Sequence, residues 1–358
     1  EIARQQVPFV LHVDTLKDEK RKMHKVRKPR VFNIAPAEFN FVCRKYFLSF
    51  SHYIMRYHNV SEIKVGINPH GVDWAIMHKY LTEVGHMGFD GDFANYDKKL
   101  PLWLTDACLE LVLSWYENHT YASEADQRTR RNLWKAMFEG YHLCHRVVYR
   151  VNGGNPSGNV LTVIVNSLAN SVLARCAWYA LVPACYDDFK ECVRFANYGD
   201  DNIFMVREDV RDLFHFAAVR DYFRSLGISY TPASKKDEDV GFKPVMELSF
   251  LKRRFRYDER LCLWRAPLEL DSIHEMVNWV RVASTPEEAL QANINAAALE
   301  LVHHGQSKFR EETNLLREAV RKAMLPLRVP TWMEALAILD GFPYSVIAPA
   351  SQTGEAGW

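Results

Sequence analysis

Residues 193–206 read VRFANYGDDNIFMV. Two apolar runs, at 193–197 and 202–206, flank the short segment Tyr198-Gly199-Asp200-Asp201. This pattern predicts a β-hairpin with a tight turn, because two strands joined by a short glycine-containing segment pair in antiparallel fashion. The tip of the hairpin then carries two neighbouring carboxylates. Asp and Gly also favour turns for local reasons, so this pair of aspartates alone does not establish a function.

A third carboxylate, Asp92, ends a short predicted strand at residues 86–93. If this strand lies beside the hairpin, the three carboxylates converge. Joining nucleotides by in-line attack at an α-phosphate develops charge on the attacking and leaving oxygens, and a pair of magnesium ions stabilises both. Magnesium prefers hard oxygen ligands such as carboxylates. Strand alternation places Asp90 on the same face as Asp92, where it could touch a metal ion or simply repel the other carboxylate, and we favour a minor or structural role for it.

A glycine-rich turn, Gly153-Gly154-Asn155-Pro156-Ser157-Gly158, precedes a long apolar stretch that predicts a buried helix at 159–182. The glycines permit unusual dihedral angles and close approach of the backbone. On the helix, Thr162 and Asn166 are four residues apart and therefore lie on one face. Local hydrogen bonding to the backbone would also explain a Thr and an Asn in a buried helix, so both interpretations stay open at this point.

A dense basic segment lies near the start of the chain. Its members are Lys17, Lys20, Arg21, Lys22, Lys25, Arg27, Lys28 and Arg30. Such a loop or ribbon could bind a triphosphate or a nucleic-acid template, because ammonium and guanidinium groups neutralise phosphate oxygens. A solvated charge run or a localisation signal fits the composition equally well.

The composition is that of a globular protein. The chain has 358 residues, of which 48% are hydrophobic and 25% charged, and its length predicts two or three packed subdomains. A net charge of +1 means that any site for a polyanion must come from local clustering. No apolar run reaches the roughly 18 residues that a membrane span requires. The chain begins at Glu1 rather than Met, which suggests a processed product or a missing upstream segment.

Cysteine and histidine do not indicate a metal centre. The seven cysteines are scattered without a CxxC pair, which favours a reducing compartment over a disulfide framework. His142, Cys144 and His145 are close in sequence, but no second ligand pair stands at zinc spacing, so we expect no zinc site there.

Taken in order, these motifs resemble those of the RNA-dependent RNA polymerases of picornaviruses and related insect or marine picorna-like viruses. The matching residues are Lys17-Asp18-Glu19 through Arg30, Asp92 with Asp97, Ser157-Gly158 with Thr162 and Asn166, Tyr198-Gly199-Asp200-Asp201, and Phe250-Leu251-Lys252-Arg253. The resemblance covers about residues 11–332, and Ser272-Ile273-His274-Glu275 with Trp279 is similar to the thumb of the family. The family carries a long segment ahead of the position of Lys17, so we expect this chain to be a catalytic core that lacks most of the N-terminal fingers.

The resemblance implies roles for the acidic and amide residues. Asp92 and Asp200 would hold two Mg²⁺ ions, for which Mn²⁺ could substitute, and Asp201 would assist. Asp97 would pair with Asn166 to sense the ribose 2′-hydroxyl, which distinguishes ribonucleotides from deoxyribonucleotides. Ser157 and Thr162 would support this network.

The resemblance also implies roles for the basic residues. Lys17 and Arg30 would contact the incoming triphosphate. Lys235 matches the lysine proposed as general acid to pyrophosphate, with Lys236 as its alternative and an ordinary surface lysine as the competing interpretation. RNA template and primer would be bound by Arg21, Lys25, Lys252 and Arg253, together with Gly158.

The implied fold is α+β: a right hand with an antiparallel palm sheet flanked by helices, partial fingers and a helical thumb. We expect fingers at 1–49, palm at 50–135, a fingers insertion at 136–152, more palm at 153–258, and the thumb with a C-terminal tail at 259–358.

The implied activity is RNA synthesis on an RNA template from nucleoside triphosphates, in replication of a positive-strand genome. The implied partners are RNA, a viral protein primer and other replication proteins, and the implied location is the host-cell cytoplasm, in replication complexes that reach membranes through those partners. Reverse transcription is a rival, because related palms use similar aspartates, although Asp97 with Asn166 favours ribonucleotides. An inactive RNA-binding module is a second rival.

Overall fold

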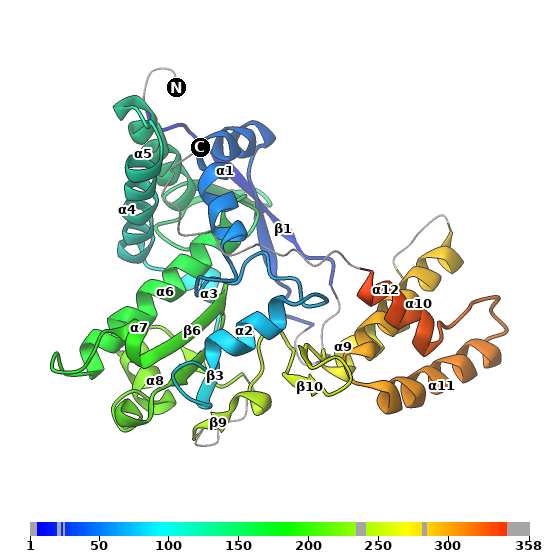
Figure 1. Cartoon of the computed structure of the whole chain (residues 1–358). Helices are drawn as coiled ribbons and strands as arrows, with labels where there is room; N and C mark the ends of the chain where they lie inside the picture. Colours follow the sequence, from blue (N-terminus) through cyan, green and yellow to red (C-terminus); the bar gives the residue numbers. More distant parts are fainter. Residues whose placement is uncertain (1–5, 20–22, 24–25, 234–240, 281–284, 342–358) are drawn as a thin grey trace. The chain divides into compact units, whose positions relative to one another are not determined.

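The computed structural model describes residues 6–19, 23, 26–233, 241–280 and 285–341. The chain divides into two compact units (Figure 1). The first unit comprises Glu1–Gly66 and Glu83–Lys243, and the second comprises Ile67–Thr82 and Pro244–Trp358. Each unit has a hydrophobic core of its own.

An antiparallel sheet with the order β6-β7-β3-β8 forms the centre of the first unit. The strands in this order are β6 (Val193–Tyr198), β7 (Asp201–Val206), β3 (Met87–Phe93) and β8 (Tyr230–Thr231), and a fifth strand, β9 (Lys243–Pro244), also pairs with β3. Strands β6 and β7 pair along their whole length, from Val193 opposite Val206 to Tyr198 opposite Asp201. The predicted hairpin and the predicted antiparallel sheet are therefore confirmed.

Aromatic packing holds β3 against the hairpin. Phe89 of β3 stacks on Phe204 of β7 with 4.9 Å between ring centroids, and Phe204 lies 4.4 Å from the ring of Phe195 in β6. All three rings are buried. A slip of one residue would turn Phe89 to the opposite face of the sheet, so this cluster favours the register that brings the end of β3 to the hairpin tip.

The helices of the first unit pack on this sheet or on one another (Figure 1). They are α1 (Ala37–Arg56), α3 (Tyr96–Lys99), α4 (Leu102–His119), α5 (Glu124–Phe138), α6 (Thr162–Leu181), α7 (Phe189–Cys192), α8 (Phe216–Ser225) and the 3₁₀ turn η3 (Glu208–Val210). Every residue of α6 from 164 to 171 is buried, as expected for a predominantly apolar helix inside a core. The polar residues Asn166, Ser167 and Asn170 in this stretch must therefore find partners inside the protein.

A second sheet, with the order β2-β1-β4-β5, carries the basic segment. Its strands are β1 (Leu11–Leu16), β2 (Val31–Ile34), β4 (Tyr141–Cys144) and β5 (Val147–Arg150). Strands β1 and β2 are antiparallel, so the basic residues lie at their ends and in the connection between them. Strand β4 pairs with β1 in parallel, although the two are far apart in sequence. This pairing was not predicted.

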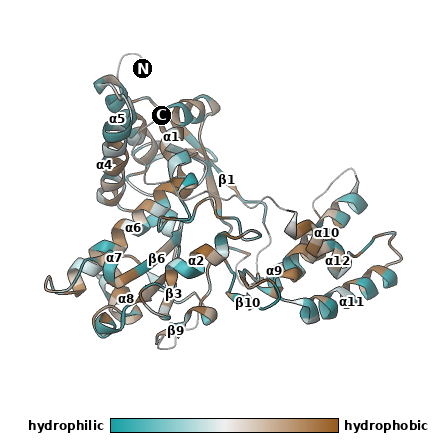
Figure 2. Cartoon of the chain, viewed as in Figure 1, coloured by the Kyte–Doolittle hydropathy of each residue, from teal (hydrophilic) through white to brown (hydrophobic). Residues whose placement is uncertain are grey.

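The described part of the second unit is mostly helical, as expected for a thumb. It contains α2 (Asp73–Leu81), the pair β10 (Arg256–Asp258) and β11 (Leu263–Arg265), the 3₁₀ turn η4 (Val245–Glu247), α9 (Leu270–Asn278), α10 (Pro286–Val302), α11 (Gln306–Lys322) and α12 (Trp332–Asp340). The short β9 (Lys243–Pro244) lies where the chain passes between the units. Figure 2 shows that α10 is more hydrophobic than α11. Leu301, Phe309 and Trp332 belong to the core that these helices share.

A tight turn interrupts the segment 247–257. Phe250 and Arg253 exchange two backbone hydrogen bonds of 2.9 Å around Leu251 and Lys252, which have φ angles of 54° and 58°. Two consecutive residues with positive φ form a tight turn of the I′ type, so the chain reverses there and only Arg256–Asp258 remains extended. Within the described part of the chain, no helix combines the length and the apolar character needed to cross a membrane.

Candidate active site

The hairpin tip is held from beneath by α6. Gly199 has a φ of +64° at the first central position of the turn, which a residue without a Cβ adopts at low cost. Its N–H donates to Ser167 Oγ at 2.8 Å, and its carbonyl accepts from Asn170 Nδ2 at 3.0 Å. These buried polar groups of α6 therefore fix the position of the turn that carries Asp200, which is exposed.

Strand β3 brings Asp92 to the same end of the sheet. The register pairs Asp90 with Ile203 and Gly91 with Asn202, so the strand continues past the start of β7 at Asp201. Asp92 is half-buried and pairs on its other side with Thr231 of β8. The sheet therefore brings together the end of β3 and the tip of the hairpin, as the sequence predicts.

The pKa of the buried Tyr230 phenol depends on these carboxylates. Its hydroxyl donates to Asn202 Oδ1 at 2.6 Å. The pKa of Tyr230 is raised well above its ordinary value, first by burial and then by the negative charges of Asp90, Asp201 and Asp92. One phenol within electrostatic reach of three carboxylates places those carboxylates in one neighbourhood.

Glycine at position 91 makes room for this phenol. A Cβ on Gly91 would lie 2.0 Å from both Cζ and Oη of Tyr230. The ring therefore crosses β3 where that strand has no side chain. Close approach of this kind is a common reason for glycine inside a strand.

The base of the basic segment lies near the same carboxylates. The N–H of Lys17 donates to the carbonyl of Arg30 at 2.9 Å, which closes the connection between β1 and β2. The Arg30 guanidinium binds Glu19, with Nε at 2.7 Å from Oε1. The pKa of Arg30 is raised, first by its hydrogen bond with Glu19 and further by the charges of Asp200 and Asp97. The structure thus places Arg30 in the electrostatic field of residues from two other motifs.

Asp97 and Asn166 form a direct pair. Asn166 Nδ2 donates to Asp97 Oδ1 at 2.6 Å, which joins α3 to α6. The neighbouring Tyr96 is buried, and its hydroxyl donates to the carbonyl of Asn166 at 3.2 Å. Burial raises the pKa of Tyr96, and Asp200 and Asp97 raise it further. Asp97 therefore belongs to the same electrostatic neighbourhood as the hairpin tip.

The glycine-rich turn is hydrogen-bonded to the first residue of α6 and packs closely against β2. Thr162 Oγ1 donates to the carbonyls of Pro156 and Asn159 at 3.0 and 2.9 Å, so this hydroxyl stabilises the turn. A Cβ on Gly158 would lie 1.9 Å from the carbonyl oxygen of Asn33 in β2. The backbone of Gly158 therefore does approach a neighbour closely, but that neighbour is strand β2 and not a ligand. The predicted contacts of Ser157 and Gly158 with nucleotide or RNA stay predictions.

The remaining predicted site residues belong either to undescribed parts of the chain or to the second unit. Arg21, Lys25, Lys235 and Lys236 lie outside the described residues. Lys252 and Arg253 belong to the second unit. Arg253 is buried, and its guanidinium binds both oxygens of Glu300 at 2.7 Å and the carbonyl of Ala266 at 2.9 Å. This geometry does not support the predicted contact of Arg253 with primer.

A pocket beside Asp97 contains polar residues that sequence reasoning missed. Its volume is about 400 Å³, and its lining includes Asp97, Asn33, Asp14, His142 and Tyr149. Asp14 accepts hydrogen bonds from Tyr149 Oη at 2.5 Å and Asn33 Nδ2 at 2.6 Å. Burial opposes ionisation of Asp14, but these bonds outweigh it and lower its pKa. Only the pairing of β1 with β4 brings Asp14 to His142, so no local sequence signal could have revealed the group.

The chemistry of the aspartates suits divalent cations. Their oxygens are hard ligands. Asp92 and Asp201, with Asp90, also raise the pKa of the buried Tyr230, so negative charge accumulates at this end of the sheet. Across the described residues, the oxygens of Asp92, Asp200 and Asp201 do not all lie within 4.8 Å of one another.

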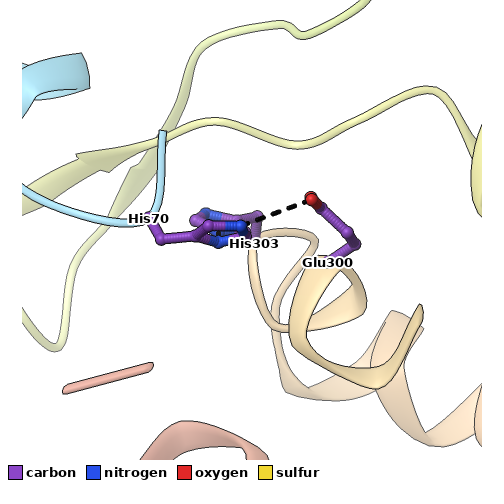
Figure 3. A group of neighbouring side chains, drawn as sticks. All are labelled: His70, Glu300 and His303. Carbon is purple, nitrogen blue, oxygen red and sulfur yellow. Dashed lines mark hydrogen bonds and ion pairs between the residues drawn. The ribbon is translucent and has the colours of Figure 1, made fainter. Parts of the chain in front are cut away.

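In the second unit, a different group of three residues has its possible ligand atoms close together. His70, Glu300 and His303 offer ligand atoms that all lie within 4.8 Å (Figure 3). His70 Nδ1 is 3.0 Å from His303 Nε2, and His70 Nε2 is 3.5 Å from Glu300 Oε1. Figure 3 shows the two rings side by side, with Glu300 reaching toward them from α10.

Hydrogen bonding disfavours a metal ion in this second group. The backbone N–H of Ala266 donates to His303 Nδ1 at 3.4 Å, so the ring proton of neutral His303 belongs on Nε2. That nitrogen then donates to His70 and has no lone pair for a metal. Metal-binding histidines show the opposite arrangement, in which the second nitrogen donates to an acceptor. Burial also lowers the pKa of His303, which keeps the ring neutral.

Comparisons with known proteins agree with these observations. The profile of the family described as viral RNA-dependent RNA polymerase matches residues 3–320. The replicase polyprotein of cricket paralysis virus is 34% identical over 332 residues, which cover 88% of this chain and 19% of that protein. The genome polyprotein of rice tungro spherical virus is 32% identical over 332 residues, which cover 89% of this chain and 9% of that protein. The chain thus spans a fifth or less of the length of these relatives.

The fold also has a solved counterpart. The RNA-dependent RNA polymerase 3Dpol of a Sicinivirus superposes with a TM-score of 0.81 at 20% identity, covering 94% of this chain and 69% of that one. The expected right-hand fold, with its antiparallel sheet flanked by helices, is thereby confirmed. The subdomain boundaries stay a prediction. By the family match and by its similarity to the picorna-like relatives, this chain belongs to the viral RNA-dependent RNA polymerase family.

Proposed function

We propose that this chain synthesises RNA on an RNA template, transferring ribonucleoside monophosphates from nucleoside triphosphates to an RNA 3′-hydroxyl in replication of a positive-strand genome. The observation that carries the proposal is the meeting of three motifs. Asp92 lies in β3 next to the Asp200–Asp201 hairpin, and Arg30 lies in the electrostatic field of Asp200. Negative charge and a cation together suit a metal-bound triphosphate.

Polymerases of this family use divalent metal ions, and we propose two Mg²⁺ ions, with Mn²⁺ as a substitute. Asp92 and Asp200 would hold them, and Asp201 would assist from the first residue of β7. When bound, the ions would stabilise the charge that develops on the attacking and leaving oxygens. The protein supplies position: β3 fixes the Asp92 backbone, and α6 fixes the turn through Ser167 and Asn170.

Binding of a triphosphate by Arg30 would require the guanidinium to leave its present partner. Its guanidinium binds Glu19 in this structure, and the side chain is 61% exposed. A triphosphate would have to replace Glu19 as its partner, and a polyanion competes well with a single carboxylate for an exposed guanidinium. Lys17 would join it from the base of the same connection. Template and primer contacts by Arg21, Lys25, Lys252 and Gly158, and proton donation by Lys235, belong to the same proposal.

The Asp97–Asn166 pair would recognise the 2′-hydroxyl of the nucleotide sugar. With Asn166 Nδ2 bound to Asp97 Oδ1, the second hydrogen of that amide and the other carboxylate oxygen are a donor and an acceptor for a 2′-hydroxyl. Reverse transcription would need no such pair. We therefore propose selection of ribonucleotides.

We also propose partners and a place of action. The relatives are named as replicase and genome polyproteins, which supports other viral replication proteins as partners, and we propose a viral protein primer as a further partner. We propose the host-cell cytoplasm, at viral replication complexes, as the place of action.

The proposal is tested with Asp200→Asn in a primed-template incorporation assay alongside an RNA-binding titration. We expect incorporation to disappear while the affinity for RNA stays within about twofold, because one exposed carboxylate at the hairpin tip contributes little to phosphate binding. A wild-type protein that binds RNA without incorporating nucleotides would favour the inactive binding module. Preferential use of deoxyribonucleotides would favour reverse transcription.

A further inference from the structure

Three buried asparagines and Asp97 form a continuous row of side-chain hydrogen bonds in the first unit. Asn159 donates from Nδ2 to Asn155 Oδ1 at 2.9 Å, and Asn155 donates to Asn166 Oδ1 at 2.7 Å. Asn166 then donates to Asp97 Oδ1 at 2.6 Å. The three asparagines are 8%, 3% and 6% exposed, so water competes little for these bonds.

The row has one consistent direction. An ionised carboxylate at Asp97 can only accept, so Asn166 must turn its NH₂ group toward it and its oxygen away. That oxygen needs a donor, which fixes the NH₂ group of Asn155, whose own oxygen then faces Asn159. The backbone N–H of Leu161 donates to Asn159 Oδ1 at 2.6 Å and completes the row. Reversing any one amide would set two donors or two acceptors against each other.

Asn155 contacts both members of the Asp97–Asn166 pair. Its backbone N–H donates to the carbonyl of Asp97 at 2.5 Å, while its side chain holds Asn166. The preceding Gly154 has a φ of +74° and donates its N–H to the carbonyl of Leu100 at 2.7 Å. The glycine-rich turn therefore lies directly on the segment that carries Asp97. The distance between Asp97 and Asn166 depends on a residue that belongs to neither of their helices.

We propose that Asn155, held in turn by Asn159, is a positioning residue for sugar discrimination. This inference rests on the proposed role of Asp97 and Asn166 in sensing the 2′-hydroxyl. Asn155 acts through Asn166 and does not touch the sugar. Held at its oxygen by Asn155, the Asn166 amide keeps its second N–H hydrogen aimed at one point, and discrimination by a hydrogen bond depends on such fixed geometry.

Asn155→Asp is the sharpest variant, because it keeps the shape of the side chain and reverses the hydrogen bonding. The new carboxylate would face Asn166 Oδ1, so the amide of Asn166 would rotate to donate to it and would turn its oxygen toward Asp97. Efficiency (kcat/KM) is measured for one ribonucleotide and for the matching deoxyribonucleotide. We expect ribonucleotide efficiency to fall by about tenfold or more, with deoxyribonucleotide efficiency nearly unchanged.

Asn159→Asp is a milder variant for the case that Asn155→Asp does not fold. It keeps the acceptor for Leu161 N–H and removes only the donor to Asn155, so we expect a smaller loss of discrimination in the same direction. Gln127→Glu is the matched control. Gln127 is also a buried amide of the first unit, but it donates to Leu113 O at 3.0 Å in the α4–α5 region. Gln127→Glu should change thermal stability without changing the ratio of ribonucleotide to deoxyribonucleotide efficiency.

The outcomes separate this inference from the function on which it rests. Asp97→Ala and Asn166→Ala with wild-type sugar preference would overturn the proposed role of the pair. If those two variants lose discrimination while Asn155→Asp and Asn159→Asp retain it, the positioning role is wrong. An equal loss of efficiency for both sugars in the Asn155 and Asn159 variants would also overturn it, because a merely structural role affects both substrates alike.

Discussion

Two groups of possible metal ligands lie in different units, and their surroundings differ. In the first unit, Asp92 and Asp201 lie in neighbouring strands and Asp200 lies in the hairpin turn. The charges of Asp90, Asp201 and Asp92 add to burial in raising the pKa of Tyr230, and the charge of Asp200 adds to the hydrogen bond with Glu19 in raising the pKa of Arg30. In the second unit, the carboxylate of Glu300 accepts hydrogen bonds from both Nη atoms of the Arg253 guanidinium.

The difference shows that proximity of ligand atoms is a poor guide to metal binding. The second group has the closer ligand atoms. Its carboxylate is neutralised by a buried arginine, and its imidazoles are directed by a backbone donor, so the group is satisfied without an ion. The first group concentrates negative charge at an exposed hairpin tip, which is where a divalent cation gains most.

Removal of divalent metal should have the largest effect and separates the two groups directly. We expect a chelator to lower the incorporation rate by at least roughly a thousandfold, because the ions stabilise transition-state charge by several kcal/mol. The melting temperature in the same buffers should change little. A large fall in melting temperature on chelation, absent in a His303→Gln variant, would instead reveal a structural metal in the second unit.

Breaking the buried ion pair should have the next largest effect. Arg253→Met leaves the Glu300 carboxylate buried without its partner, and we expect a loss of about 3–5 kcal/mol in the free energy of unfolding of the second unit. Chemical denaturation followed by tryptophan fluorescence measures it. Arg253→Met combined with Glu300→Gln should recover part of the loss. If Arg253→Met instead unfolds like wild type but loses primer affinity, the original prediction of a primer contact is correct.

Acidification extends the comparison to a second pair of histidine rings, in the first unit. His12 stacks on His142 with 4.9 Å between centroids, and burial, followed by the charge of His142, lowers the pKa of His12 to about 4. Its unfolded pKa is near 6.5, so the unfolded chain takes up the proton first, and stability is lost as the pH falls from about 6.5 to 4.

His12→Phe should remove this acid sensitivity. Over that pH range the loss of stability should be smaller in the variant than in wild type by up to about 3 kcal/mol. Denaturation midpoints at several pH values would measure the slope. Parallel slopes for the two proteins would show that His12 does not contribute.

Weakening the partner of Arg30 should have the smallest effect. Glu19→Gln removes the charge that competes with a triphosphate for this exposed guanidinium. Exposed ion pairs contribute less than about 1 kcal/mol, so we expect the Michaelis constant for nucleotide to fall by about twofold to fivefold with little change in kcat. A raised Michaelis constant would mean that Glu19 orients Arg30 for binding instead.

Much of the site could be predicted because its motifs are local. The hairpin follows from two apolar runs around one glycine, and the helix with Thr162 and Asn166 follows from a long apolar stretch. The burial of Arg253 could not be predicted, because its partner Glu300 is far away in sequence and basic residues are exposed by default. The side chain of Asn155 also gave no signal, because an Asn in a glycine-rich turn is usually explained by the turn alone.

By itself the sequence determined which segments are strands and helices near the hairpin, and therefore which residues stand at strand ends and turns, because these follow from side-chain periodicity and glycine over a few positions. Only the tertiary structure decided which of those residues meet. Burial of Phe89 against Phe204 favours the register that brings Asp92 to the hairpin, and the row from Asn159 to Asp97 forms where a loop lies on a distant helix. Such contacts depend on packing between segments that are remote in sequence, and no local pattern encodes them.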